Sequence, residues 1–412
     1  MTKLNMQPVT FEEALDLVLR QAEAVTRPPE YINLGKAVNR TLAEDIFADI
    51  DIPGADSSSM DGYCLKSTDI IGATREKPVK LPVVPGIDAG HTIESLPMGH
   101  CAYIATGAIL PPGADAVVRI EDTEVSEDTS RIDFFVDVVK GNYIRPRGSE
   151  LKRGDLMVKA PAVITPQIAG QIASAGQQSV KVLKKPTVAI LTSGDEVLMP
   201  FDQPQPWQVR NSNSTILSLQ AKEAGAEVID LGIARDRGEH ARNMFLKAVE
   251  IADIVVTSGG ISMGRRDPIK NVLIELGIEA IFYGVRMKPG KPVFFGAYNG
   301  KTIFALPGNQ VSTSVTFELF VRPFIRKILQ APPQRLTLEL ALTRASDNKE
   351  GRDFFKRGRP VYSEGQLMVE PLASQESHML SSLAGADLLF LHPANAGLLP
   401  AGSKVKCFYL KG

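Results

Sequence analysis

The pattern of hydrophobic and polar positions changes along the chain, and its first part predicts helices. Residues 10–25 open with Thr-Phe-Glu-Glu, which has the form of a capping box, and apolar residues then follow at helical spacing. We therefore expect an amphipathic helix over 10–25, and a second short helix fits Gly35–Glu44. From Ile46 the chain changes to short strands broken by proline and glycine, which predicts a β-rich region up to about Asn142.

The next stretch, residues 148–182, contains a turn, a strand and a helix that starts near Thr165. It is too short to enclose a core of its own, so we expect it to form one discontinuous domain with residues 1–45. Residues 46–147 would then be a β-rich domain inserted into this linker domain.

In residues 183–330, apolar strand-like runs alternate with helical patterns. This alternation predicts an α/β domain with a mainly parallel sheet covered by helices on both faces. From Pro332 the pattern is strand-like again, which predicts a small C-terminal β domain over 331–412.

Three segments of the α/β region pass from an apolar strand through small residues into a helix: TVAILTSGDEV, ADIVVTSGGISMG and TIFALPGNQVS. Such switches leave unpaired backbone N–H groups and the positive end of a helix dipole, which suit an anion. On parallel sheets these loops lie at the same edge, so we expect one anion-binding site. Neither GxxxxGK[ST] nor GxGxxG is present, which disfavours an ordinary kinase or dehydrogenase. The alternative is that the glycines only make tight turns.

Composition and charge narrow the class of protein. A length of 412 residues predicts two to four domains, and 44% hydrophobic with 23% charged residues is typical of a globular protein. The net charge of −1 gives no electrostatic footprint for nucleic acid or for an anionic membrane surface. We expect neither partner.

The N-terminus has no apolar signal region and no run approaches the ~18 apolar residues of a membrane span, so we expect a cytoplasmic protein. The 3 cysteines are scattered, which suits a reducing compartment, and the 5 histidines show no metal-ligand spacing. Any metal would therefore be bound by oxygen ligands.

Seven segments in one order resemble the landmarks of the molybdopterin molybdenumtransferases, whose relatives include the C-terminal part of gephyrin: SSSMDGYCL, ATGAILPPGADAVV, IRPRGSELKRGD, LTSGDEV, VVTSGGISMGRRD, MKPGKPVFFG and LPGNQVS. The resemblance implies a linker domain, an inserted β domain, an α/β molybdopterin-binding domain and a C-terminal β-barrel. It also implies a homodimer with clefts built from both subunits. The implied reaction inserts molybdate into adenylylated molybdopterin and releases AMP, with Mg2+ as the metal cofactor. A molybdopterin adenylyltransferase that supplies the substrate is a possible protein partner.

The resemblance marks acidic residues as catalytic, and its motifs place them at Asp61, Glu150, Glu196, Asp236 and Asp267. Carboxylate oxygens suit Mg2+, and we expect Glu196, Asp236 and Asp267 to hold it. A solvated carboxylate or a helix cap is the competing interpretation, above all for Asp236. No general base stands out from the sequence.

Substrates that carry phosphate and molybdate also need cations and hydrogen-bond donors. We assign Lys288 and Lys291 to molybdate or a terminal phosphate, and Arg145 and Arg147 to wider phosphate contacts, with surface salt bridges as the alternative. The remaining expected substrate contacts are Thr106, Ser193, Gly194, Ser258, Gly259, Gly260, Ser262, Pro307, Gly308, Asn309 and Ser377. His378 could contact the substrate as well, but a surface histidine with no such role explains it equally well.

Some positions depart from the family pattern. Gln310 stands where the family commonly has proline, and Arg265-Arg266 stand where an acidic residue is frequent. Tungstate in place of molybdate is therefore an open alternative, as is a divergent paralogue. A non-catalytic scaffold would be expected to carry a further domain, and a competence-damage type of nucleotide enzyme would not need residues 1–182.

Overall fold

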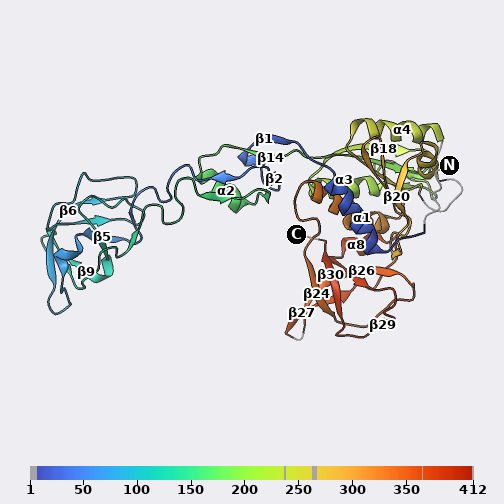
Figure 1. Ribbon diagram of the computed structural model, residues 1–412. Coiled ribbons are helices and arrows are strands. Elements are labelled where there is room, and N and C mark those ends of the chain that lie inside the picture. Colours follow the sequence, from blue (N-terminus) through green and yellow to red (C-terminus); the bar gives the residue numbers. More distant parts are fainter. Residues whose placement is uncertain (1–6, 236–237, 262–266, 364, 411–412) are drawn as a thin grey trace.

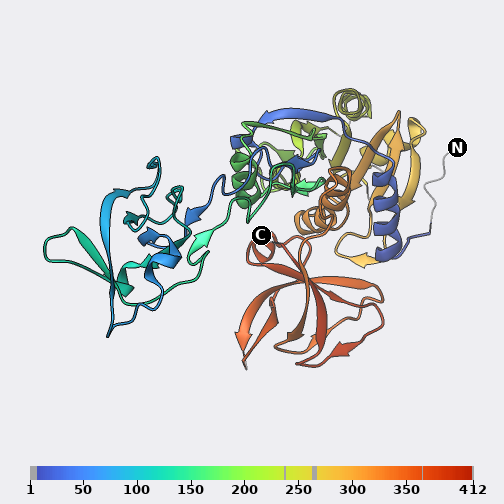
Figure 2. The same cartoon turned by 60° about the vertical axis from the view of Figure 1, so that its left-hand side comes forward.

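A computed structural model describes residues 7–235, 238–261, 267–363 and 365–410. The chain is elongated: an arm formed by residues 48–155 extends away from the α/β region and the C-terminal β region, which lie against each other (Figures 1 and 2). No helix in the described part of the chain is both long and apolar enough to cross a bilayer.

The first helix forms as the sequence predicts. Helix α1 (Phe11–Glu23) is capped by Thr10, whose hydroxyl accepts from the Glu13 backbone N–H at 3.2 Å. The Glu13 carboxylate in return accepts from the Thr10 backbone N–H at 2.8 Å, which completes the capping box. The apolar stripe of α1, including Phe11 and Val18, is buried in the main core of the α/β region.

The expected helix over Gly35–Glu44 is wrong. Only a 3-10 turn, η1 (Leu34–Lys36), forms there, and the chain continues into strand β2 (Thr41–Leu42). Asn39 adopts a left-handed backbone conformation with φ 66°, which ends any helix at that point. The strand pairing of β2 then uses the backbone groups that a helix would have needed.

Two segments far apart in the sequence join in one linker sheet of order β1-β14-β2-β13. Its strands are β1 (Pro29–Asn33), β2, β13 (Ala162–Val163) and β14 (Ser179–Leu183). Helix α2 (Pro166–Ser174) packs beside it and begins after Thr165, as predicted; the Thr165 hydroxyl accepts from the Ile168 backbone N–H. Strand β3 (Ile46–Phe47) pairs with β12 (Leu156–Val158), where the chain leaves for the arm and returns.

The arm is built around a six-stranded sheet of order β8-β5-β7-β6-β10-β9. These strands are β5 (Gly62–Leu65), β6 (Val79–Ile87), β7 (Cys101–Ile104), β8 (Ala116–Arg119), β9 (Thr123–Val125) and β10 (Arg131–Phe134). A short pair, β4 (Ser57–Ser58) with β11 (Ile144–Arg145), lies at the end of the arm that faces the linker.

The α/β region has a six-stranded sheet of order β18-β15-β19-β23-β22-β20, in which the first four strands are parallel. Its strands are β15 (Thr187–Ser193), β18 (Glu227–Ala234), β19 (Ile254–Ser258), β20 (Glu279–Tyr283), β22 (Phe294–Tyr298) and β23 (Lys301–Leu306). Its helices are α3 (Ser212–Ala224), α4 (Gly238–Ile251), α5 (Pro268–Glu275), α6 (Gln310–Thr316) and α7 (Arg322–Ile328), with a π-helical turn at Phe317–Val321 between the last two.

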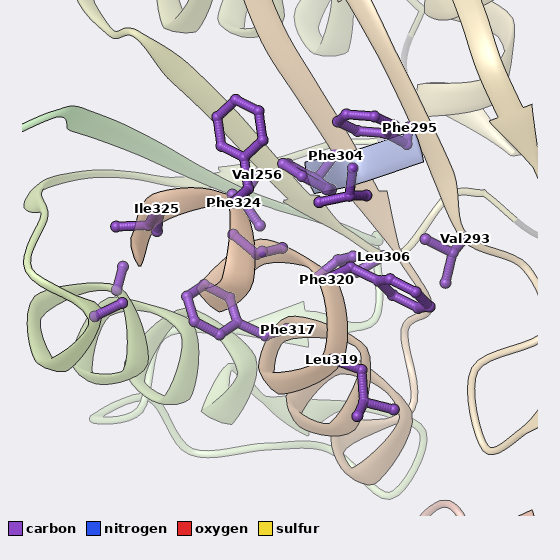
Figure 3. Packing of buried hydrophobic residues seen from close by; sticks show 14 of the residues in the cluster. Val256, Val293, Phe295, Phe304, Leu306, Phe317, Leu319, Phe320, Phe324 and Ile325 are labelled. Carbon is purple, nitrogen blue, oxygen red and sulfur yellow. The ribbon is translucent and has the colours of Figure 1, made fainter. Parts of the chain in front are cut away.

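Alternate residues of the central strands enter two different cores. Val188 and Ile190 pack with helices α1, α3, α6 and α7, whereas Ala189 and Leu191 pack with α4 and α5. Both faces of the sheet are therefore covered, which confirms the prediction. Aromatic rings fill the first core: Phe304 stacks on Phe295 with ring centroids 4.7 Å apart (Figure 3).

The C-terminal region is a closed barrel. Its strands follow the order β26-β27-β24-β30-β28, and the last of them, β28, pairs with the first, β26. Its strands are β24 (Thr337–Leu342), β26 (Asp353–Ser363), β27 (Gln366–Pro371), β28 (Leu388–His392) and β30 (Lys404–Tyr409). The sequence pattern missed β26, which carries charged residues in its middle. Strand β21 (Met287–Lys288) of the α/β region pairs with β26 and joins the two regions.

Replacement of Phe304 with alanine tests the aromatic core. The ring is fully buried against Phe295 and Phe324, so Phe304→Ala should lower the free energy of unfolding by about 3–5 kcal/mol. The control is Leu219→Ala on the exposed side of α3, where 61% of the side chain is in solvent and the expected change is within about 0.5 kcal/mol. Urea unfolding followed by circular dichroism measures both, and equal midpoints for the two variants would contradict this role of Phe304.

Candidate functional site

The three glycine- and serine-containing loops meet because their strands are neighbours. Strands β15, β19 and β23 lie side by side and parallel, with Thr192 opposite Ser258 and Ser258 opposite Leu306. Their carboxyl ends are therefore level, and the loops that follow leave the sheet at one edge. This is the edge at which ligands bind in open parallel sheets.

A cleft of about 620 Å3 opens at that edge. The cleft is lined by these residues of the sequence prediction: Ser193, Gly194, Glu196, Ser258, Gly259, Gly260, Asp267, Pro307, Gly308 and Asn309. His378 from the barrel region also lines it. Two predicted residues, Asp236 and Ser262, lie outside the described residues, as do Arg265 and Arg266.

Two glycines let the backbone approach the neighbouring loop closely. Gly259 and Gly260 have φ of 88° and 65°, in the left-handed region. A Cβ atom on Gly259 would lie 2.7 Å from the Ser193 carbonyl oxygen, and one on Gly260 would lie 2.6 Å from the Ser193 hydroxyl. The TSG loop after β15 and the TSGG loop after β19 therefore pack with no room for a side chain between them.

Three helices begin at the cleft. Helix α3 starts after its cap Asn211, α5 after Asp267, and the helix of α6 after Asn309, and all three cap residues line the cleft. The first backbone N–H groups of a helix have no partner within it, so they offer donors and partial positive charge. Gln310 occupies the first position of α6 and lines the cleft as well, so it adds a polar side chain to the wall.

Asn213, which the sequence analysis missed, ties two of the loops together. Its amide Nδ2 donates to the Ser258 hydroxyl at 2.9 Å and to the Gly308 carbonyl oxygen at 2.7 Å. The Asn213 Oδ1 atom and the Ser193 hydroxyl are buried without a hydrogen-bond partner in the structure. Buried polar atoms are nearly always paired, so these two atoms are exceptions, and both residues line the cleft. The only sequence signal is the position of Asn213, two residues after the cap of α3.

Two of the three predicted metal ligands, Glu196 and Asp267, line the cleft. Among the described residues no group of three or more histidine, cysteine, aspartate or glutamate side chains is close enough to hold a metal alone. Mg2+ needs only one or two carboxylates when substrate phosphates and waters complete its shell. Glu196 and Asp267 are the acidic side chains of the cleft lining in the described part of the chain.

Lys288, Lys291 and Ser377 lie outside the cleft lining, at the junction with the barrel. Lys288 donates from Nζ to the Glu350 carboxylate at 2.6 Å, and this bond is the largest cause of the lowered pKa of Glu350. Lys291 is exposed. The Ser377 hydroxyl accepts from the Asn309 amide at 3.0 Å, which connects this junction to the cleft.

The other predicted residues, Asp61, Thr106, Arg145, Arg147 and Glu150, belong to the arm, away from the cleft of the same chain (Figures 1 and 2). The Asp61 carboxylate accepts from the Thr106 backbone N–H at 2.7 Å and from its hydroxyl at 2.8 Å. These bonds, the backbone one first, lower the pKa of Asp61 and keep it charged. Arg147 donates from Nε to Asp51 at 2.5 Å.

Comparisons with known proteins cover nearly the whole chain. Residues 9–176 match the family described as MoeA N-terminal region (domain I and II), 189–327 match the probable molybdopterin binding domain, and 339–410 match the MoeA C-terminal region (domain IV). A molybdopterin biosynthesis MoeA protein from Pyrococcus horikoshii, solved by crystallography, superposes with a TM-score of 0.84 at 25% identity. That match covers 98% of this chain and 100% of the other.

Two curated relatives carry the name molybdopterin molybdenumtransferase. The protein from Bacillus subtilis is 31% identical, over 98% of this chain and 94% of its own length. The protein from Haemophilus influenzae is 33% identical, over 96% of this chain and 97% of its own length. With these matches and a shared fold from end to end, the chain belongs to the molybdopterin molybdenumtransferase family.

Proposed function

We propose that this protein is a transferase that inserts molybdenum from molybdate into molybdopterin. The observation that carries the proposal is the cleft at the ends of β15, β19 and β23, where three glycine-containing loops and three helix starts meet. Molybdate and the molybdopterin phosphate are both anions, and backbone N–H groups at helix starts bind anions without a buried countercharge. Ser193 and Asn213 line the same cleft and contribute to its polar wall.

The form of molybdopterin that best suits the cleft is the adenylylated one, with AMP as the leaving product. Its pyrophosphate would lie across the helix starts, where donors fixed in place stabilise charge that develops on the phosphate oxygens. Glu196 and Asp267 would hold Mg2+ against this pyrophosphate, and the ion would neutralise charge on the phosphate that departs. A separate adenylyltransferase would then have to supply the substrate.

Molybdate would bind beside the cleft, at the junction with the barrel, where Lys288 and Lys291 supply positive charge. Glu350 accepts hydrogen bonds from both Lys288 and Arg352, so the cations outnumber this carboxylate. A lysine that donates to a carboxylate is held in position. Ser377 reaches Asn309 at the cleft wall, so an oxyanion at this junction would be adjacent to the pterin nucleotide.

A homodimer would explain why the functional residues fall into two groups within one chain. The arm carries Asp61 and Arg147, and both carboxylate and guanidinium are exposed at its surface. In a two-fold dimer the same surfaces meet reciprocally, so each arm would reach the cleft of the other subunit. Each active site would then combine cleft residues of one chain with arm residues of its partner.

The direct test of the function is an incubation of the protein with adenylylated molybdopterin, molybdate and Mg2+. Release of AMP and formation of molybdenum cofactor should rise together. A second incubation uses molybdopterin without the adenylyl group. If cofactor forms only from this substrate, the protein is a molybdenum transferase, but the adenylylated form is not its substrate. Absence of cofactor formation from either form would reject the transferase.

Mixed dimers test the shared site. Asp61→Asn and Glu196→Gln should each abolish AMP release, because each removes a charge from one half of the site without a change of volume. Co-expression of the two variants should restore about a quarter of the wild-type rate, since half of the dimers are mixed and one of their two clefts is intact. No recovery in mixed dimers, isolated by a different affinity tag on each variant, would contradict a site shared between subunits.

Alanine substitutions at two glycines with nearly equal φ distinguish the effect of backbone strain from the effect of a methyl group placed against the cleft wall. Gly260 and Gly277 have φ of 65° and 64°, but a Cβ atom meets the Ser193 hydroxyl at 2.6 Å only at Gly260 and meets nothing within 4 Å at Gly277. Each change to alanine should cost about 1–2 kcal/mol of stability. Only Gly260→Ala should also reduce cofactor formation, by about a hundredfold, because it displaces Ser193 in the site. Equal activity of the two stable variants would remove the Ser193 contact from the mechanism.

A further inference from the structure

A loop of unusual composition rises at the rim of the cleft. Residues 199–208, here called the aromatic loop, connect β16 (Val197–Leu198) to β17 (Val209–Arg210), and these two strands pair with each other. Val197, Val209 and Arg210 line the cleft, so both ends of the aromatic loop are part of the cleft wall. The Val209 backbone N–H donates to the Glu196 carbonyl oxygen at 2.9 Å and fixes the returning end beside a predicted metal ligand.

The aromatic loop exposes two large rings to solvent. Phe201 is 79% exposed and Trp207 is 65% exposed, and Trp207 is the only tryptophan of the chain. Val209, at the base of the loop and in the cleft wall, is 48% exposed. Apolar surface that gathers at one exposed place marks a binding surface more often than single exposed residues do.

The cleft beside this loop, in the part that the structure describes, has no large aromatic ring on which a flat heterocyclic ligand could stack. None of the residues that line it in the described part of the chain is phenylalanine, tyrosine or tryptophan. Its wall is instead rich in polar side chains, among them Asn309, Gln310 and Ser312, which suit the hydrogen-bonding edge of a pterin. The flat face of that ring system still requires an apolar partner, and the nearest exposed rings along the chain are those of the aromatic loop.

The aromatic loop is also held in place before any ligand binds. It contains Pro200, Pro204 and Pro206, which restrict its backbone. The Arg210 guanidinium donates from Nε to the Asp202 carbonyl oxygen at 3.1 Å and ties the middle of the loop to its base. A restrained loop loses little conformational freedom when a ligand covers it, so stacking would contribute to affinity almost in full.

We infer that Trp207 of the aromatic loop stacks on the pterin ring of the substrate held in the cleft. This inference rests on the proposed function, because it names the part of the molybdopterin substrate that this surface binds. Stacking on a ring acts on the bound substrate and the transition state alike, so Trp207 sets the KM for the pterin and leaves kcat unchanged.

Substitutions at Trp207 test this positioning role. Trp207→Leu keeps an apolar side chain but removes the ring, and should raise the KM and the Kd for molybdopterin about tenfold. Trp207→Phe keeps an aromatic face and should recover most of that affinity, and kcat should change less than about twofold in both variants. The matched control is Tyr362→Leu, because Tyr362 is 77% exposed and lies in β26 of the barrel, in a part of the chain that contributes no wall to the cleft.

Shielding of the tryptophan gives a second readout that does not need activity. Acrylamide should quench Trp207 fluorescence in the free protein, and saturating molybdopterin should protect it while AMP alone should not. Protection by AMP alone, or protection that appears on raising the protein concentration without ligand, would assign the ring to the adenine or to a second subunit and overturn the inference. So would an unchanged KM in a folded Trp207→Leu variant. If wild-type protein forms no cofactor, the proposed function fails, and the molybdopterin Kd and the shielding still decide the role of Trp207.

Discussion

The parallel pairing of β15, β19 and β23 is the constraint on which the site depends. Adjacent parallel strands in register end at the same level, so Ser193, Ser258 and Pro307 emerge side by side although more than sixty residues separate the first from the second. The cap residues of the helices that follow, Asn211, Asp267 and Asn309, then line one cleft, although only the loop between β23 and α6 is short. The sheet itself therefore brings the backbone N–H donors for an anion together, and no separate folding step is needed.

A second constraint comes from the linker sheet, where β14 pairs with β1 along five residues and also with β2. This sheet has its own core, with residues such as Leu42, Ile172 and Val182 fully buried. The arm therefore stands on a packed base and not on a pair of flexible connections. A base of this kind is what an arm needs if its polar tip is to meet another surface in a defined orientation.

Local signals in the sequence were sufficient for some features. The capping box at Thr10, the cap at Thr165 and the small residues after each strand act within a few residues, so they could be identified without any tertiary contact. The expected helix over Gly35–Glu44 failed because the left-handed Asn39 and the pairing of β2 with strands more than a hundred residues away override helical propensity.

The residues of the candidate site that come directly after a strand could be predicted from the sequence. The role of Asn213 could not, because its two hydrogen bonds reach loops 45 and 95 residues further along the chain. The contact of Asp61 with Thr106 spans 45 residues for the same reason. Lys288 was singled out by its motif, yet its partner Glu350 comes from the barrel region, which no local pattern indicates.

The crossing between linker and arm has a consequence for the modular history of the chain. Strand β3 (Ile46–Phe47), which leaves the linker, pairs antiparallel with β12 (Leu156–Val158), which returns to it. Paired antiparallel residues lie only about 4.5–5.5 Å apart, a gap that a two-residue turn can close. The whole arm can therefore be excised or exchanged as a cassette, and recombination could vary what the arm reaches while the remainder of the protein kept its fold.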